Sequence, residues 1–491
     1  MENTIKCLIA AALLMGTSAP AAQAQSPRLD PSFAITSALD SAGRASISEM
    51  VLQPDGKLVV YGSFYEINGR PAPGLARLLP DGRVDTTFAA PLFNGLVDAL
   101  ALQADGKLLV GGRFITVGGQ SRIGLARLLA SGRLDFGFLS PFGSGPPPNP
   151  AYSSVRRIVL QPGKGVLVLG TMVPLGSSGI GGFFAARLSE ATGTRDTTFR
   201  LPANVVRNIV NDVLVLPTGH LVFSGRPNLF NGQPCPVWGA LPDGANDPSF
   251  VPLPGINTYS DARDLARDPA TGNLYVVRAG GRVLSFEPVR LLPNGVLDPT
   301  FRVAGSFGPS FSVAGSMAVQ PNGRLLLGGD FSVAGGLFGS VRLLPSGALD
   351  PSYDPSLGPG RGSVSRVLVQ PDGKLLFAGG FADAGGFALT ALARMLDPNV
   401  LLAARAGASE ADELAAWPVP AHDVLHLGLP AGRAGRQATL LDALGRVVLR
   451  QALAPGAAAP ALPTAGLAPG AYLLRVDFAS GPPAYRRVAV E

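Results

Sequence analysis

An arginine and an aspartate recur together along most of this chain of 491 residues. The arginines are Arg77, Arg127, Arg187, Arg290, Arg342 and Arg394, and the aspartates are Asp30, Asp85, Asp135, Asp196, Asp247, Asp298 and Asp350. Such charges could form a ring of ligand-binding groups on one face of the molecule. Alternatively, each pair could stabilise a turn within its own repeat, because an aspartate side chain accepts hydrogen bonds from the amides that follow it. We favour the second interpretation, which makes these charges structural.

The rest of the chain is poor in residues that carry chemistry. Its histidines are His220, His422 and His426, and its cysteines are Cys7 and Cys235. They form no cluster with zinc-ligand spacing, and the sequence contains no D-x-D-x-D calcium loop, no G-x-S-x-G elbow and no phosphate loop with G-K-S/T. We therefore predict no catalytic residue, no metal site and no bound cofactor.

Two recurring phrases of sequence set the positions of the repeated charges. The first is LQPDGKLVVYGSF at Leu52 to Phe64, and the second is LARLLPDGRVDTTF at Leu75 to Phe88. The turn inside the first phrase recurs at Asp55-Gly56, Asp105-Gly106, Gly163-Lys164-Gly165, Thr218-Gly219, Thr271-Gly272, Asn322-Gly323 and Asp372-Gly373, in steps of about 50 to 59 residues. Self-similarity at such a period indicates a repeat architecture.

Each repeat is expected to form four short antiparallel strands. The Asp-Gly or Asn-Gly turn reverses the chain, and the apolar run after it is typical of a strand covered on both faces. A glycine closes that run where the backbone approaches another strand or bulges, at Gly62, Gly112, Gly170, Gly225, Gly329 and Gly379. The arginine strand and an outer LDPSF segment complete the four. One propeller blade has this composition, so we predict an all-β, seven-bladed β-propeller.

The two ends of the repeat array favour a closed ring. The seventh copy lacks its LDPSF phrase, and the N-terminal segment Leu29 to Phe33 supplies that phrase. A strand contributed from the other end of the chain would leave no edge unpaired. We therefore expect residues 29–33 to pair with the last blade, within 366–396.

The repeats resemble the delta-60 repeat, a bacterial β-propeller repeat without a defined biochemical role, over about residues 29–399. Three copies depart from the pattern. Copy five has Arg278 where the others have glycine, copy four has Ala240 at the expected arginine position, and copy three is slipped at QPGKGVLV. Blades three to five should be the least regular. The Asp-box and Trp-rich motifs of sugar-cleaving and quinone-binding propellers are absent.

The C-terminal residues 416–491, which we call the tail, have a different pattern. Alternating strands between turns predict a small Ig-like β-sandwich after a linker at 400–415. The tail resembles the type A sorting domain of the type IX secretion system of Bacteroidota. The resemblance is carried by Pro418, Pro420, Asp442, Gly445, Arg446, Gly470 and Tyr472. It implies the type IX secretion machinery as a partner, whereas an ordinary accessory domain is the alternative.

The N-terminus reads as a secretory signal over residues 1–24. Lys6 precedes an apolar run of about ten residues, too short to span a bilayer, and the expected cleavage lies between Ala24 and Gln25. The propeller would then occupy 25–399 of an exported protein with no membrane-spanning segment, and we expect a monomer. The net charge of +6 forms no basic stripe with interleaved aromatics, so we expect no nucleic-acid partner.

Function is expected in the loops that vary between blades. The most irregular are Leu139 to Ser154, Val173 to Phe184 and Ser224 to Trp238. The first hypothesis is a secreted or surface-exposed, non-catalytic scaffold that binds glycan or protein. The alternative is a secreted propeller enzyme, a polysaccharide lyase or glycoside hydrolase, with its site in the central channel. Carboxylates, His or Tyr converging at the channel mouth would favour the enzyme.

Overall fold

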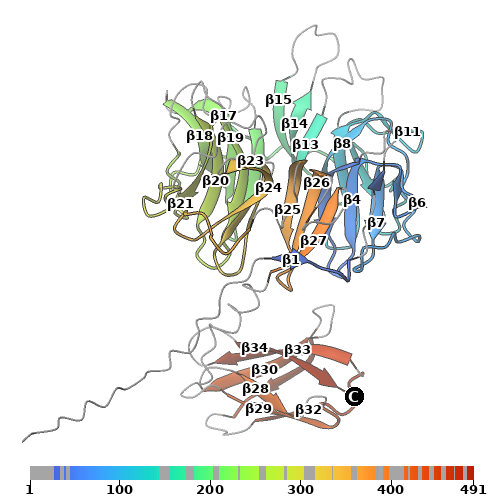
Figure 1. Ribbon diagram of the computed structural model, residues 1–491, viewed down its shortest axis with the longest axis vertical. Helices are drawn as coiled ribbons and strands as arrows, with labels where there is room; N and C mark the ends of the chain where they lie inside the picture. The colour runs from blue at the N-terminus through green and yellow to red at the C-terminus, as the bar shows by residue number, and fades with distance from the viewer. Residues whose placement is uncertain are drawn as a thin grey trace, which may run out of the picture.

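The computed structural model is built from β-strands (Figure 1). It describes residues 27–33, 38–39, 45–140, 142, 154–172, 182–202, 210–230, 233–253, 261–280, 285–303, 316–333, 336–354, 362–381, 384, 391–397, 414–417, 421–429, 434–441, 447–454, 460–468, 470–478 and 484–490. Within these ranges, no helix is long and apolar enough to cross a membrane.

Seven antiparallel sheets follow one another along the repeat array, and we number them in that order. Sheet one is β3 (Ser46–Leu52), β4 (Leu58–Ser63) and β7 (Leu75–Leu78); sheet two is β8 (Leu96–Leu102), β9 (Leu108–Arg113) and β12 (Leu125–Leu128); sheet three is β13 (Ser154–Gln161), β14 (Gly165–Met172) and β15 (Gly182–Leu188); sheet four is β16 (Val210–Val215), β17 (Leu221–Phe230) and β18 (Gln233–Ala240). Sheet five is β19 (Asp261–Arg267), β20 (Leu274–Gly280) and β21 (Ser285–Leu291); sheet six is β22 (Ser316–Val319), β23 (Leu325–Val333) and β24 (Gly336–Leu343); sheet seven is β25 (Gly362–Val369), β26 (Leu375–Phe381), β27 (Leu392–Leu396) and β1 (Arg28–Leu29).

Two small sheets lie outside this series. One consists of β2 (Ala38–Leu39), β5 (Glu66–Ile67) and β6 (Arg70–Pro71), and the other of β10 (Thr116–Val117) and β11 (Gln120–Ser121). The fourth, outer segment of sheets one to six is reduced to isolated bridges beside the third strand, as between Leu78 and Val84, with two bridges in sheet four.

The first strands of the seven sheets contact one another in a closed cycle. β3 packs beside β8, β8 beside β13, and so on through β16, β19 and β22 to β25, which contacts β3. The apolar cores lie between neighbouring sheets: Val59 and Leu75 of sheet one pack with Val97 and Val110 of sheet two. Each sheet is therefore covered on both faces, which explains its nearly continuous apolar strands.

The predicted pairing of the N-terminal segment with the last sheet is confirmed. β1 pairs antiparallel with β27, with Arg28 opposite Leu396 and Leu29 opposite Met395 (Figure 1). It takes the position that the LDPSF phrase holds in the other sheets, because the Asp30 amide donates to the Arg394 carbonyl as the Asp85 amide does to Arg77.

The glycines that close the second strand allow a close backbone approach, as predicted. In sheet one the register shifts between Ile47 and Glu49, which is a β-bulge opposite Gly62. A Cβ atom at Gly62 would lie 1.9 Å from the Ser46 carbonyl oxygen, and one at Gly112 would lie 2.1 Å from the Leu96 carbonyl oxygen. Arg278 does replace the glycine in sheet five, opposite Ala262.

The tail contains two antiparallel sheets that share one core. One has β28 (Ala415–Trp417), β29 (Val424–Gly428) and β32 (Ala461–Pro463), and the other has β31 (Val447–Ala452), β30 (Gly435–Leu441), β33 (Gly470–Phe478) and β34 (Ala484–Val490). Leu425 and Leu462 of the first sheet pack with Leu440 and Leu474 of the second.

Candidate functional site: an interrupted contact between sheets four and five

The repeated arginine and aspartate form an ion pair within six of the seven sheets. In each, the arginine Nε lies 2.7–2.9 Å from the aspartate Oδ2, and both side chains are largely buried. The guanidinium also lies over the aromatic ring that ends the LDPSF phrase, at 4.4–5.1 Å from its centroid. The structural interpretation of these charges is confirmed, since each arginine has partners within its own repeat.

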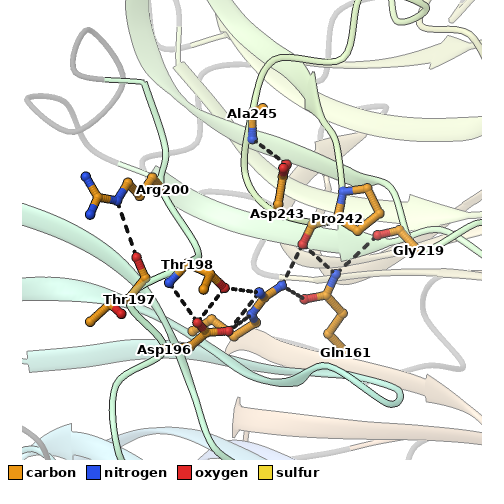
Figure 2. A network of polar contacts seen from close by, with 10 residues as sticks. Gln161, Asp196, Thr197, Thr198, Arg200, Gly219, Pro242, Asp243 and Ala245 are labelled. Atoms are coloured by element: carbon orange, nitrogen blue, oxygen red, sulfur yellow. Dashed lines mark hydrogen bonds and ion pairs between the residues drawn. The ribbon is translucent and has the colours of Figure 1, made fainter.

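The same arginines also join each sheet to the next one. Their Nη1 atoms donate over 2.5–2.7 Å to Ala130, Glu190, Pro242, Pro345 and Pro80 carbonyl oxygens and to the Asp397 carboxylate. A glutamine at the end of the first strand adds a second donor at some contacts. Between sheets three and four, Gln161 donates to the Pro242 carbonyl over 3.2 Å, beside Arg187 (Figure 2).

The aspartates also accept hydrogen bonds within their own turns. Every one accepts a hydrogen bond from the backbone amide two residues on, as Asp196 does from Thr198 (Figure 2). Hydrogen bonds from the Thr198 hydroxyl and amide, reinforced by Arg187, lower the pKa of Asp196 to about 2. Burial alone would raise the pKa of Asp85, but the bonds from Thr87 and Arg77 outweigh it and the pKa falls below its ordinary value.

Sheet four lacks this arginine, and the structure corrects the position at which it is replaced. Ala240 bridges Asn246 and pairs with Leu221, as Leu128 bridges Leu134 and pairs with Leu108. Ala240 therefore corresponds to a leucine of the other copies, and the prediction that it holds the arginine position is wrong. The residue at that position is Gly239, whose carbonyl accepts from the Asp247 amide.

The second cross-sheet donor is lost at the same contact. Leu216 takes the place of Gln161, because its amide donates to the His220 carbonyl as the amide of Gln103 donates to Lys107. The acceptor in sheet five, the Pro293 carbonyl, corresponds to that of Pro242. Among the residues that the structure describes, none donates a hydrogen bond to it.

A cavity of about 440 Å³ lies where these donors are missing. Sheet four contributes Leu216, Thr218 and His220 from its first turn and Asp247, Ser249 and Phe250 from its outer segment. Arg267, Gly272, Pro293 and Asn294 of sheet five form the facing wall. A hydrogen bond from the Val251 amide to the Asn294 carbonyl, 2.7 Å long, still joins the two sheets beside the cavity.

His220 and Asp247 form the polar centre of this cavity. The His220 Nδ1 lies 2.6 Å from the Asp247 Oδ2, and the Ser249 hydroxyl donates to Asp247 Oδ1 over 2.6 Å. Burial would raise the pKa of Asp247, but these hydrogen bonds lower it below its ordinary value, so the carboxylate is charged at neutral pH. His220 holds the turn position that Lys57 holds in the first repeat. Its place in the sequence therefore does not identify it as part of a site.

A second group of charges lies on the innermost strands. Arg366 of β25 pairs with Glu49 of β3 over 2.7 Å, and Arg157 of β13 pairs with Asp212 of β16 over 2.5 Å. Asp264 of β19 accepts the Met317 amide over 2.6 Å. Burial, with repulsion from Asp212, raises the pKa of Asp264 to about 7. Strand bulges bring these groups together, which spacing along the chain does not reveal.

A cavity of about 500 Å³ between sheets one and two has a different origin. Tyr61, Tyr65 and Phe93 line it together with Asp98 and Arg113. The link from Arg77 to Ala130 is intact at this contact, so the second cavity does not result from a change in the repeat.

Most residues predicted for targeting lie outside the described part of the chain. This holds for Ala24, Gln25, Pro418, Pro420, Asp442, Gly445 and Arg446. Most of the irregular loops at 139–154 and 173–184, where binding was predicted, also lie outside it. Gly470 begins β33, and the buried Tyr472 donates its hydroxyl to the Ala468 carbonyl over 2.5 Å. Such a tyrosine contact to upstream backbone occurs in Ig-type sandwiches.

Solved structures similar to this chain share little sequence with it. Two of them are structures of one extracellular domain from B. thetaiotaomicron, described once as part of a hybrid two component system and once as part of a one component system. The first is 12% identical, with a TM-score of 0.45, over 82% of this chain. The second is 11% identical, with a TM-score of 0.47, over 91% of this chain. This chain spans 44% and 52% of those two chains. PorZ, a surface component of the type-IX secretion system of Porphyromonas gingivalis, is 13% identical, with a TM-score of 0.29, over 92% of this chain and 82% of its own.

A family comparison is informative for the repeats. No curated protein matches the chain. The family described as "Domain of unknown function (DUF5122) beta-propeller" matches residues 53–88, 103–138, 320–353 and 370–396. These segments lie in sheets one, two, six and seven, whereas the segments of sheets three to five are unmatched. With the closed cycle of sheet contacts, the matches identify the fold as a β-propeller.

Proposed function

We propose that this protein is an exported, non-catalytic, seven-bladed β-propeller that binds a glycan or protein partner at the cell surface or outside the cell. Sheets one to seven would be its blades, and the tail would be an Ig-like sandwich that directs export. The cavity between sheets four and five carries this proposal. It is the place where the repeat gives up both of its cross-sheet donors and leaves an acceptor facing a cavity.

Selection for stability alone would favour keeping those donors. Each such hydrogen bond contributes about 0.5–1.5 kcal/mol to stability, and six contacts of the ring retain the arginine. Binding sites are commonly concave, with a few converging polar groups on an apolar wall. The His220–Asp247 pair against Leu216 and Phe250 has this character.

Capture of partners by the full chain tests the proposal. A glycan array and a pull-down would be run with the wild type and with Thr218→Trp, which places an indole at the cavity. Asp372→Trp is the matched control, because Asp372 holds the same turn position in sheet seven. We expect capture to be lost in T218W and kept in D372W. Equal capture by both variants would exclude the cavity as the binding site.

Export is proposed through the signal at 1–24 and the type IX machinery acting on the tail. Removal of residues 416–491 in a Bacteroidota host should leave the protein in the periplasm, because the sorting signal is lost. Fractionation with a detection tag after residue 25 measures this. Unchanged release of the truncated chain would refute the sorting role.

A second candidate function rests on Asp264. A carboxyl with a pKa of about 7 suits general acid–base chemistry, so a lyase or glycoside hydrolase with its site in the central channel is the alternative. Polysaccharide degradation by the wild type that is abolished in Asp264→Asn would favour this enzyme. The ion pairs of Glu49 and Asp212 with arginines support a structural role for the group instead.

A further inference from the structure

We propose that the cavity between sheets four and five binds the guanidinium group of an arginine side chain from a peptide or protein partner. This inference rests on the proposed binding function and specifies its ligand. The repeat itself provides the argument, because six neighbouring contacts show how this protein holds a guanidinium group.

The contact between sheets three and four shows the complete arrangement. The Arg187 guanidinium lies against Asp196, the Thr198 hydroxyl and the Phe199 ring of its own sheet. It also donates to the Pro242 carbonyl of sheet four over 2.6 Å. Figure 2 shows Asp196, Thr198 and Pro242 converging from the two sheets.

All four receptor groups persist at the cavity, although the arginine is gone. Asp247, Ser249 and Phe250 correspond in sequence to Asp196, Thr198 and Phe199 of the preceding repeat, and all three line the cavity. Pro293 lines it from sheet five in the position of Pro242. A carboxylate, a hydroxyl, a carbonyl and an aromatic face together favour a planar cation with several N–H donors.

The ligand must come from outside the repeat. A Cβ atom at residue 239 would lie 2.4 Å from the Phe250 Cβ, so Phe250 packs on the bare backbone of Gly239 and closes the route of an internal side chain. Thr218, Ser249, Pro293 and Asn294 are exposed, which places the cavity at the surface.

His220 does not prevent a guanidinium from reaching Asp247. In sheet six, Asp350 Oδ2 lies 2.8 Å from the Nε atoms of both Arg324 and Arg342. Arg324 holds the turn position of His220, and Arg342 is the strand arginine. One carboxylate of this repeat thus accommodates a turn side chain and a guanidinium together.

Arg267 is the wall residue that opposes a cationic ligand. The corresponding residues of the first and seventh repeats are Leu52 and Val369, so the charge is a particular feature of sheet five. Electrostatic repulsion from Arg267 lowers the affinity of the cavity for a cationic ligand that has no carboxylate to pair with this arginine. The charge also allows a rival interpretation, in which Arg267 and His220 bind an anion.

Calorimetric titration of the full chain with agmatine, butylamine and acetate distinguishes these ligands. We expect agmatine to bind saturably, and butylamine and acetate to bind at least about tenfold more weakly. The planar guanidinium can donate to Asp247 and Pro293 while it lies over the Phe250 ring, whereas the ammonium of butylamine is a compact, strongly hydrated charge and acetate carries no donor. Preferred binding of acetate, or equal binding of agmatine and butylamine, would overturn the proposal.

Substitutions test whether agmatine binds in the cavity between sheets four and five. Asp247→Asn should weaken agmatine binding at least about tenfold, whereas Asp105→Asn, an exposed turn aspartate, should not change it. If D247N is poorly folded, Leu216→Gln replaces it, since its amide would compete for the Pro293 carbonyl and weaken binding severalfold. Arg267→Leu should strengthen agmatine binding. Unchanged binding in both D247N and L216Q, or weaker binding in R267L, would overturn the site.

The failure of this inference can be told apart from failure of the proposed function. If the partner captured through the cavity is not displaced by agmatine, the binding function stands and the arginine ligand is refuted. If agmatine binds but neither a glycan nor a protein is captured, the guanidinium site is supported and the proposed function of binding such a partner is refuted.

Discussion

The contacts on the two sides of sheet four differ in their cross-sheet hydrogen-bond donors. On the side of sheet three, Arg187 and Gln161 both donate to Pro242 (Figure 2). On the side of sheet five, Gly239 and Leu216 replace them and a cavity follows. Both sides keep the aspartate turn and a backbone hydrogen bond from the outer segment, from Arg200 to Asp243 and from Val251 to Asn294.

The ring of sheets therefore tolerates the loss of the cross-sheet hydrogen-bond donors at one contact. The turn around Asp247 is held by the amide and hydroxyl of Ser249, so the outer segment keeps its shape without an arginine. Stability is distributed over the other contacts, as in repeat arrays whose energy is a sum over neighbours. One contact can therefore serve binding while the others preserve the fold.

Acidification should have the largest effect, because it acts on all intact contacts together. The pKa values of Asp30, Asp85, Asp196, Asp298 and Asp350 are lowered in the folded chain. A lowered folded-state pKa stabilises the protein above the unfolded value and the stabilisation is lost as pH falls through the folded value. Urea midpoints should thus fall steeply between about pH 4 and pH 2.

The same titration compares the two sides of sheet four. Asp196→Asn should remove more of this pH dependence than Asp247→Asn, because the pKa of Asp196 is lowered to about 2 and that of Asp247 is lowered less. A urea midpoint that stays constant from pH 5 to pH 2.5 would contradict the stabilising role of the aspartates.

Deletion of residues 25–35 should have the next largest effect. It removes β1 and leaves the buried Arg394 without Asp30, Ser32 and the Phe33 ring. Leaving a buried charge unpaired costs about 3–5 kcal/mol, so the melting temperature should fall by about 5 °C or more once the lost strand is included. Calorimetry measures the change, and an unaltered melting temperature would argue against ring closure by this segment.

Arg187→Gly converts the intact contact into the interrupted one. We expect a loss of about 1.5–3 kcal/mol in the free energy of unfolding, because Asp196 and Pro242 both lose a donor. Arg83→Gly is the control, since the Arg83–Asp81 pair is exposed and should contribute below about 1 kcal/mol. Equal effects of the two substitutions in urea denaturation would remove the distinction between buried and exposed pairs.

The smallest effect is expected from a reciprocal exchange at the glutamine position. Leu216→Gln restores a donor to the Pro293 carbonyl and should raise the free energy of unfolding by about 1 kcal/mol. Gln161→Leu removes three hydrogen bonds, which Gln161 donates to Gly219 and Pro242 and accepts from Arg187, and should lower it by about as much or more. If L216Q destabilises the protein as Q161L does, the two contacts do not correspond.

The repeat units were predictable because each depends on local rules. Asp-Gly turns, the closing glycines and the covered apolar strands follow from backbone geometry within one repeat, and the missing phrase of the last copy predicted its pairing with residues 29–33. The position of the lost arginine was predicted wrongly, because the strand before Leu241 has no arginine to fix its register. Aligning the Leu-Pro-Asp-Gly turn at 241–244 with 79–82 would have placed it at Gly239.

The candidate site could not be predicted, because none of its residues is unusual when it is considered alone. His220 stands at a turn position that is lysine in copies one, two and seven, and Leu216 and Gly239 are ordinary strand residues. The group around Asp264 was hidden as well, since Glu49 and Arg366 are 317 residues apart and meet only through ring closure.

The sequence by itself determined the β-strand repeat, the structural nature of the Arg–Asp pairs and the pairing of the two ends, since these depend on patterns repeated in every copy. Only the tertiary structure decided where the repeat leaves space. A cross-sheet donor and its acceptor lie about one repeat apart, so the loss of Arg187's counterpart is felt at Pro293, 54 residues after Gly239. The packing of sheet four against sheet five leaves the cavity beside Pro293, and the spacing of the repeats along the chain does not reveal it.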